Sequence, residues 1–225
     1  MLNTAVGSML GKLFDVRKLT DSYVRIVKTT KEIVIDLEVS LTKKKTAIDT
    51  GLNFLDHMMD TLAWGACMSI GVSAKTTASH RLTHTIAEDA AITLGVALKS
   101  LHDRRVVKGL NGTGAGLFGL DDGLARAMIS IEGRRNTFME LAAPGVKLEK
   151  VEDMLTQDCI AFVEGLSQGL GATIHLDILK GHDPHHCWEA ASRALGEALR
   201  ELFTDNSWRK AADNPYYSEE GVALA

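Results

Sequence analysis

The stretch HTIAEDAAITLGVAL (84–98) returns as HHCWEAASRALGEAL (185–199), at a fixed offset of 101 residues. Alanine and leucine recur by chance because they are common in helices, but chance would not readily place the same histidine and the same glutamate in both copies. The chain is therefore predicted to be a duplication of one half. Seven of the fifteen aligned positions are identical: His84/His185, Glu88/Glu189, Ala90/Ala191, Leu94/Leu195, Gly95/Gly196, Ala97/Ala198 and Leu98/Leu199.

The residues that precede each copy extend the repeat. In the sequence alignment, this offset brings SIGVSAK (69–75) close to GATIHLD (171–177), and it aligns residues 53–64 roughly with residues 151–168. Alternating apolar residues predict strands with one buried face, and apolar residues at helical spacing predict helices. In the first half, these patterns predict strands over 22–29, 32–41 and 69–74, and helices over 53–64 and 87–101.

The sequence predicts a division of the chain into four segments. Glycine recurs five times between Gly109 and Gly119, which is too dense for a regular element and predicts a flexible loop. The predicted organisation is an N-terminal extension over 1–21, a first half-domain over 22–108, the glycine-rich loop over 109–119 and a second half-domain over 120–222.

Composition excludes several classes of protein. Of the 225 residues, 45% are hydrophobic and 24% are charged, which is typical of a globular protein, and a net charge of −4 provides no basic field for nucleic acid. The three cysteines have no C-x-x-C spacing, so neither a disulfide framework nor a zinc ribbon is expected, and a reducing, cytoplasmic compartment is predicted. No window approaches the roughly 18 apolar residues of a membrane span, so no membrane partner is expected.

The repeated histidine and glutamate indicate a metal site. Four residues apart on a helix, His84 with Glu88 and His185 with Glu189 each aim an imidazole and a carboxylate at one spot. One such pair alone would be interpreted as a solvated surface pair, but the duplication favours metal binding. His186 diverges from its neighbour by about 100° and is free to serve a second ion or a substrate. Imidazole and carboxylate without thiolate suit Mn²⁺, Zn²⁺, Fe²⁺ or Ni²⁺. Taken singly, the other histidines are more often surface or hydrogen-bonded residues: His80, His102, His175 and His182.

Four blocks resemble, in order and spacing, the signature segments of the imidazoleglycerol-phosphate dehydratase family. They are GLNFLDHMMD (51–60), HTIAEDAAITLG (84–95), LARA…EGR (124–134) and GHDPHHCWEA (181–190). The resemblance implies an α/β (α+β) fold of two similar fused halves, each a four-stranded sheet backed by helices, ribosomal protein S5 domain 2-like. It also implies a homo-oligomer that assembles through trimers into a shell of 24 subunits, with metal sites between subunits.

The family resemblance implies an activity and assigns roles to residues. Family members dehydrate imidazole glycerol phosphate in histidine biosynthesis and use two Mn²⁺ ions, which would hold the charge that develops on the imidazole ring. By resemblance, Glu32 and Glu189 are catalytic residues for proton transfer, and Arg134 and Ser218 contact the substrate phosphate. The metal ligands that the resemblance implies are His57, His84, Glu88, His185, His186 and Glu189.

Departures from the family pattern affect both the metal ligands and the phosphate contacts. Thr85 stands where the first block should have its second histidine, and Ala161 stands where another ligand histidine is expected. At least one metal site is therefore predicted to be weakened, or rebuilt with a neighbour such as His80 or Asp158. In the tail, Glu220 replaces a phosphate-binding lysine and should repel a dianion.

The departures leave three hypotheses. The chain is a dehydratase of imidazole glycerol phosphate, or a non-catalytic relative whose metal only holds an oligomeric shell together. The third is a dehydratase or isomerase of a related imidazole without phosphate, which Glu220 would tolerate better. Complementation of a histidine auxotroph separates the first hypothesis from the other two.

Overall fold

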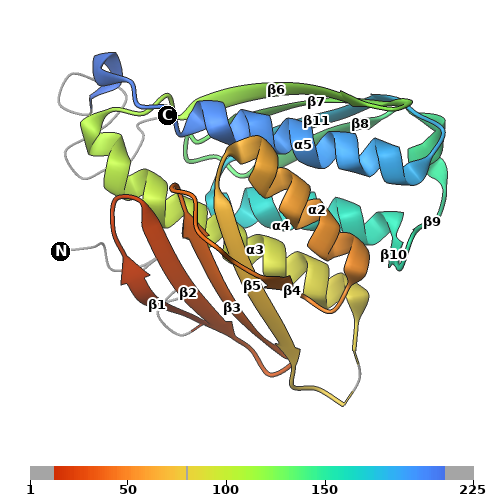
Figure 1. Ribbon diagram of the computed structural model, residues 1–225, viewed down its shortest axis with the longest axis horizontal. Coiled ribbons are helices and arrows are strands. Elements are labelled where there is room, and N and C mark those ends of the chain that lie inside the picture. The colour runs from red at the N-terminus through yellow and green to blue at the C-terminus, as the bar shows by residue number, and fades with distance from the viewer. Residues whose placement is uncertain (1–12, 80, 211–225) are drawn as a thin grey trace.

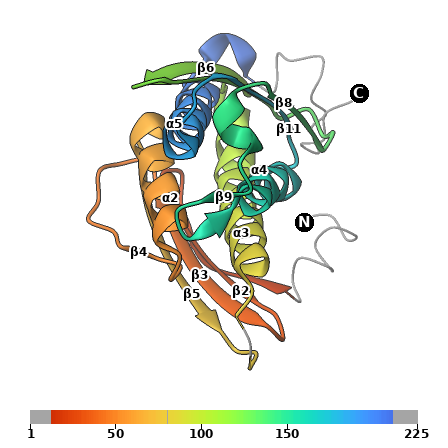
Figure 2. The ribbon, with the colours of Figure 1, turned by 90° about the vertical axis from the view of Figure 1, so that its right-hand side faces the viewer.

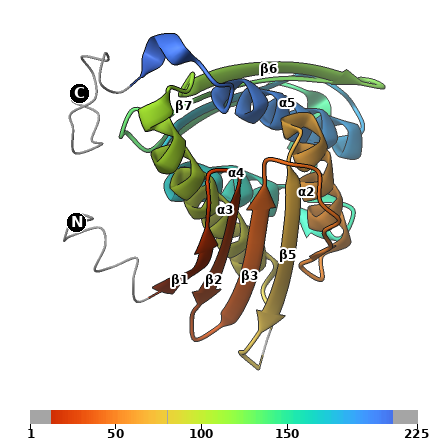
Figure 3. The same cartoon turned by 60° about the vertical axis from the view of Figure 1, so that its left-hand side comes forward.

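In the part of the chain that the structure describes, four helices lie between two β-sheets (Figure 1, Figure 3). This computed structural model describes residues 13–79 and 81–210. The helices are α2 (Asn53–Ala66), α3 (Thr83–Arg105), α4 (Thr156–Leu170) and α5 (Pro184–Leu202), and none of the described helices is long and apolar enough to cross a membrane.

The first sheet has the strand order β1-β2-β3-β5-β4 and the second has the order β6-β7-β11-β8. The strands of the first sheet are β1 (Phe14–Leu19), β2 (Tyr23–Thr29), β3 (Ile33–Ser40), β4 (Ile48–Asp49) and β5 (Ser69–Thr76). Those of the second are β6 (Thr113–Leu120), β7 (Gly123–Ser130), β8 (Asn136–Leu141) and β11 (Thr173–Lys180). A small hairpin, β9 (Lys150–Val151) with β10 (Met154–Leu155), precedes α4, and short 3-10 turns are η1 (Val106–Lys108), η2 (Pro144–Lys147) and η3 (Ser207–Arg209).

The alternating pattern of the first sheet fixes which face is buried. Ile35 and Leu37 of β3 are fully buried against the helices, whereas Asp36 between them pairs with Arg25 on the outer face, at 2.7 Å. The predicted strands and helices of this half are confirmed. Helix α3 is longer than predicted because it begins at Thr83, so that His84 and Glu88 lie in its first two turns.

Strand β1 corrects the predicted N-terminal extension. Phe14–Leu19 pairs antiparallel with β2 and adds a strand to the edge of the first sheet, beyond the four strands common to the two halves. Five of the six residues of this edge strand are exposed, so its sequence has no buried alternation that would predict a strand. Residues 1–12 lie outside the described part of the chain.

Strand β6 corrects the prediction of a flexible glycine-rich loop. Thr113–Leu120 forms a regular strand whose whole length pairs with β7. Its glycines are required by a close approach of backbones, because a Cβ on Gly114 would lie 2.0 Å from the carbonyl oxygen of Ala198, and one on Gly116 would lie 2.1 Å from that of Ala194. With no side chain at Gly114 and Gly116, α5 packs directly on this part of the sheet, whereas Phe118 on the same face contacts Arg193 of α5.

Glycine pairs at the helix crossings confirm the duplication. Helices α2 and α5 touch through Gly65 and Gly196, where a Cβ on either residue would lie 3.3 Å or less from the other's Cα. Helices α4 and α3 touch in the same way through Gly169 and Gly95. Gly196 follows Gly95 by 101 residues, whereas Gly169 follows Gly65 by 104 residues. The pairs give the register between halves: α2 and β5 align with α4 and β11 at an offset of 104.

We expect Gly116→Val to destabilise the protein by at least about 2 kcal/mol, because the new side chain would collide with the backbone of α5. The matched control is Gly119→Ala on the same strand, whose Cβ would meet no atom of the described chain closer than 3.6 Å. Urea unfolding measures both. Equal stabilities of the two variants would contradict the close packing of β6 on α5.

Candidate metal centre

The four long helices begin on the same side of the molecule, at the right of Figure 1. The start of α2 lies beside the start of α5, where His57 contacts Glu189, and the start of α3 lies beside the start of α4, where His84 lies 3.8 Å from Asp158. Carboxylates and imidazoles gather at these helix ends, where backbone N–H groups favour negative charge.

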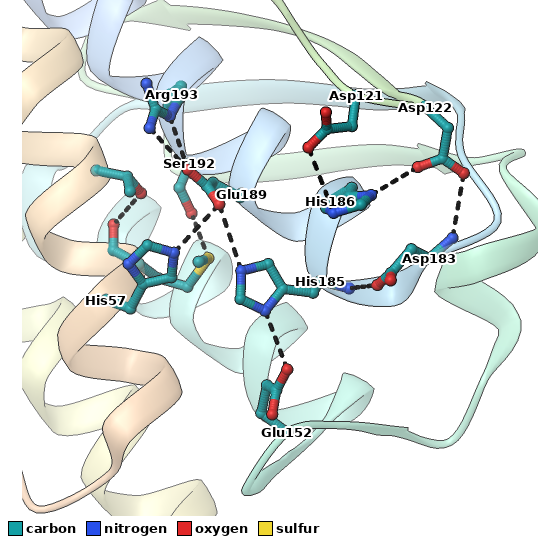
Figure 4. A network of polar contacts seen from close by, with 12 residues as sticks. His57, Asp121, Asp122, Glu152, Asp183, His185, His186, Glu189, Ser192 and Arg193 are labelled. Carbon is teal, nitrogen blue, oxygen red and sulfur yellow. Dashed lines mark hydrogen bonds and ion pairs between the residues drawn. The ribbon is translucent and has the colours of Figure 1, made fainter.

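Three side chains converge between α2 and α5. Nε2 of His57 lies 3.1 Å from Oε2 of Glu189, and Nε2 of His185 lies 3.4 Å from the same oxygen (Figure 4). One donor atom from each residue lies within 4.8 Å of the others, and this is the only such group of three or more found in the described residues. Two imidazole nitrogens and a carboxylate oxygen at this spacing suit a divalent metal ion.

Glu189 is the most buried member of the triad. Its side chain is 9% exposed, whereas those of His57 and His185 are 40% and 32% exposed. Burial raises the pKa of Glu189, but hydrogen bonds from Arg193 and His57 outweigh this effect and the pKa is lowered overall. Arg193 holds Oε1 of the carboxylate at 2.7 Å, so Glu189 stays ionised and its other oxygen faces the histidines.

His186 faces a different set of partners. Its Nδ1 lies 2.9 Å from Oδ1 of Asp122, and its Nε2 lies 3.5 Å from Asp121, in the turn between β6 and β7 (Figure 4). The other oxygen of Asp122 accepts backbone N–H groups of His182 and Asp183, which lowers the pKa of Asp122 to about 2, and the hydrogen bond to Asp122 raises that of His186. His186 and His185 therefore point apart, as their adjacent positions predict.

The equivalent place between α3 and α4 is incomplete. His84 and Glu88 stand at the positions of His185 and Glu189, but the offset of 104 residues places Ala161 at the position of His57. Oδ1 of the buried Asp158 lies 3.8 Å from Nδ1 of His84. No third donor joins them within the part of the chain that the structure describes.

Known proteins are similar to this chain in sequence and in fold. The sequence profile of the family described as imidazoleglycerol-phosphate dehydratase matches residues 50–199. The chain belongs to this family. An imidazoleglycerol-phosphate dehydratase of Scheffersomyces stipitis is 34% identical over 194 residues, which cover 86% of this chain and 80% of that protein. One of Methylococcus capsulatus is 34% identical over 177 residues, which cover 78% of this chain and 86% of that protein.

A solved structure shares both fold and sequence. The crystal structure of the dehydratase from Pyrococcus furiosus, in complex with (S)-C348, has a TM-score of 0.70 and 30% identity, and covers 87% of this chain and 99% of that one. The dehydratase structure from Staphylococcus aureus has a TM-score of 0.71 at 23% identity, which supports the fold. The predicted fold class and the predicted membership of the dehydratase family are therefore confirmed.

Other residues predicted from the resemblance lie away from the triad. Glu32 is exposed and lines a small hollow with Thr85 at the start of α3, and Arg134 is exposed in the turn between β7 and β8. The backbone carbonyl of Arg134 accepts a hydrogen bond from Thr173, at the end of β11 that is farther from the start of α5, and this eight-residue strand is roughly 23 Å long at about 3.3 Å per residue. Ser218 and Glu220 lie outside the described residues, as does His80.

The remaining histidines lie outside the triad, and the buried Nε2 of His102 has no hydrogen-bond partner among the described residues. His102 is buried and lies 3.1 Å from Asp103, His175 stacks on Phe138 at 4.9 Å on the outer face of the second sheet, and His182 uses its backbone N–H.

Three residues around the triad are not predicted from the sequence: Arg193, Glu152 and Asp122. Arg193 follows Glu189 by four residues, a spacing that signals an ion pair on a helix. Glu152 and Asp122 carry no such signal, because each comes from a turn that only the folded chain brings beside α5.

Proposed function

We propose that this chain is a metal-dependent dehydratase that acts on imidazole glycerol phosphate in histidine biosynthesis. The triad of His57, His185 and Glu189 carries the proposal, because it provides a preorganised site for a divalent ion. Membership of the dehydratase family and the names of the relatives support the substrate. A bound ion would stabilise the negative charge that develops on the imidazole ring when the adjacent C–H proton is removed.

The residues around the triad suggest how its roles are divided. We assign Glu189 to metal binding rather than proton transfer, since a carboxylate with a lowered pKa is a weak base. Glu32 is then the proposed proton-transfer residue. Glu32 lies beside Thr85 at the start of α3, away from the triad between α2 and α5. It is therefore proposed to serve a metal site that another subunit completes.

The ion is proposed to be Mn²⁺, which the family resemblance implies, although Zn²⁺, Fe²⁺ and Ni²⁺ suit the same donors. The proposed phosphate contacts are Arg134 and Ser218. An exposed guanidinium such as that of Arg134 suits a phosphate in a bidentate contact.

We expect the purified protein to hold fewer than two tightly bound ions per chain, because only one of the two equivalent places has three donors among the described residues. Elemental analysis after dialysis against metal-free buffer measures the ratio. Two tightly held ions per chain would show that other groups replace the missing histidines.

The activity test is the conversion of imidazole glycerol phosphate by the protein loaded with Mn²⁺, together with complementation of a histidine auxotroph. The proposal expects turnover and growth. A protein that binds Mn²⁺ but neither turns over the substrate nor supports growth would instead be the non-catalytic relative or an enzyme of another imidazole.

We also propose a cytoplasmic homo-oligomer, built from trimers into a shell. The three free cysteines agree with a reducing compartment. Neighbouring positions on the outer face of the second sheet form the mostly apolar row Ala115, Met128, His175 and Phe138. Met128 and Phe138 are about half exposed and the Arg126–Asp177 ion pair borders the row, so this face offers a second copy an apolar patch with a charged edge. Sedimentation velocity measures the assembly.

A further inference from the structure

We propose that Glu152 is a positioning residue of the metal centre, which holds the His185 ring so that Nε2 faces the ion. The inference rests on the proposed metal-binding function. It concerns a residue from the hairpin of β9 and β10, far in sequence from the helices that supply the triad.

The two ring nitrogens of His185 face two carboxylates. Nδ1 lies 3.1 Å from Oε1 of Glu152, and Nε2 lies 3.4 Å from Oε2 of Glu189 (Figure 4). An ionised carboxylate only accepts hydrogen bonds, so a proton on Nδ1 satisfies Glu152 and leaves the Nε2 lone pair directed at the space shared with His57. Metal-bound histidines are oriented in this way by a carboxylate behind the ring.

The backbone at Glu152 is unusual for a side-chain-bearing residue. Its φ of 50° lies in the left-handed region, which favours glycine because a Cβ there meets the following carbonyl oxygen. The side chain of Glu152 is 57% exposed, so burial of its own atoms does not explain the conformation. The contact with His185 is the only hydrogen bond or ion pair of this carboxylate among the described residues, and it accounts for a glutamate at a position that suits glycine.

The same hairpin fixes the other helix of the triad. Asp153, the next residue, accepts the backbone N–H groups of Asn53 and Phe54 at 2.7 and 2.9 Å, and so caps the start of α2, which carries His57. Phe54 also packs on the ring of His185, with 5.3 Å between the centroids. The hairpin therefore sets α2 and the His185 ring relative to one another. Figure 2 shows β9 of this hairpin beside α2.

The test compares Glu152→Gly with Glu152→Gln, using Mn²⁺ alone as the probe in calorimetric titrations of the metal-free protein. We expect Glu152→Gly to weaken Mn²⁺ binding by about 10- to 100-fold. The same change should raise the unfolding midpoint of the metal-free protein, because glycine adopts a positive φ without a steric clash. Glu152→Gln retains an acceptor oxygen, so its loss of affinity should be smaller than that of the glycine variant.

The control is Glu149→Gly, an exposed glutamate near the same hairpin at ordinary φ, which should leave Mn²⁺ affinity unchanged. A merely structural role of Glu152 predicts that affinity and stability move together, whereas positioning predicts that they move in opposite directions. If the wild type binds Mn²⁺ and Glu152→Gly binds it equally well, only the positioning role is overturned. If the wild type shows no Mn²⁺ binding that His57→Ala removes, the metal centre itself is wrong and the inference falls with it.

Discussion

Replacing His57 with alanine is expected to weaken divalent-metal binding by more than about 100-fold and to remove the dehydratase activity. His57 is one of three proposed ligands, so its removal should cost more than the loss of a residue that only hydrogen-bonds to a ligand. Loss of such a residue lowers metal affinity by about 10- to 100-fold. His57 is the only member of the triad that α2 supplies. Its loss leaves one imidazole beside a carboxylate that Arg193 already holds, at 2.7 Å.

The lower metal affinity of His57→Ala should also reduce the stabilisation of the folded protein by bound metal. An ion at about 100 times its dissociation constant stabilises the folded wild type by about 2.7 kcal/mol, whereas the variant should gain almost nothing at the same concentration. Thermal unfolding with and without Mn²⁺ measures this difference. Asp60→Ala is the matched control, because Asp60 is exposed on the same helix and lies outside the triad. An unchanged response of His57→Ala to Mn²⁺ would exclude the triad as the metal centre.

Replacing Ala161 and Thr85 together with histidine is expected to add a second metal site and raise the ratio from one ion per chain toward two. The register of the glycine pairs carries this prediction, because it aligns Ala161 with His57 and Thr85 with His186. The incomplete site between α3 and α4 already contains His84, whose Nδ1 lies 3.8 Å from Oδ1 of Asp158. Ala161→His should therefore supply the third donor beside His84 and Glu88, as His57 does beside His185 and Glu189, whereas Thr85→His restores the position of His186, which points away from the triad.

The control moves one new histidine by a single residue. Ile160→His with Thr85→His places the imidazole about 100° around α4, so it should not join His84 and should add no ion. Ala161 is only 3% exposed, so the stability of the metal-free double variant is measured first by urea unfolding. A folded double variant that still holds a single ion would show that the second place lacks more than the missing imidazoles.

Much of this protein follows from its sequence because the signals are local. Alternation along β3 and helical spacing along α2 predict elements whose buried faces the fold confirms. The repeat predicts two similar halves, and its histidine and glutamate predict a pair of ligands one helical turn apart. His185 and Glu189 are such a pair, since residues four apart on a helix share a face whatever surrounds them.

Other features depend on contacts between segments that are far apart in the sequence, and only the tertiary structure shows them. The glycines of β6 appear as a flexible loop in sequence, but they are the surface on which α5 packs, and only the fold brings Gly116 to Ala194. The exposed edge strand β1 gave no burial pattern. Distances across the molecule also joined His57 to Glu189, placed Glu152 behind His185, and left Ala161 opposite His84 without an imidazole. Each of these contacts joins residues far apart in the chain, and no local pattern encodes which of them will meet.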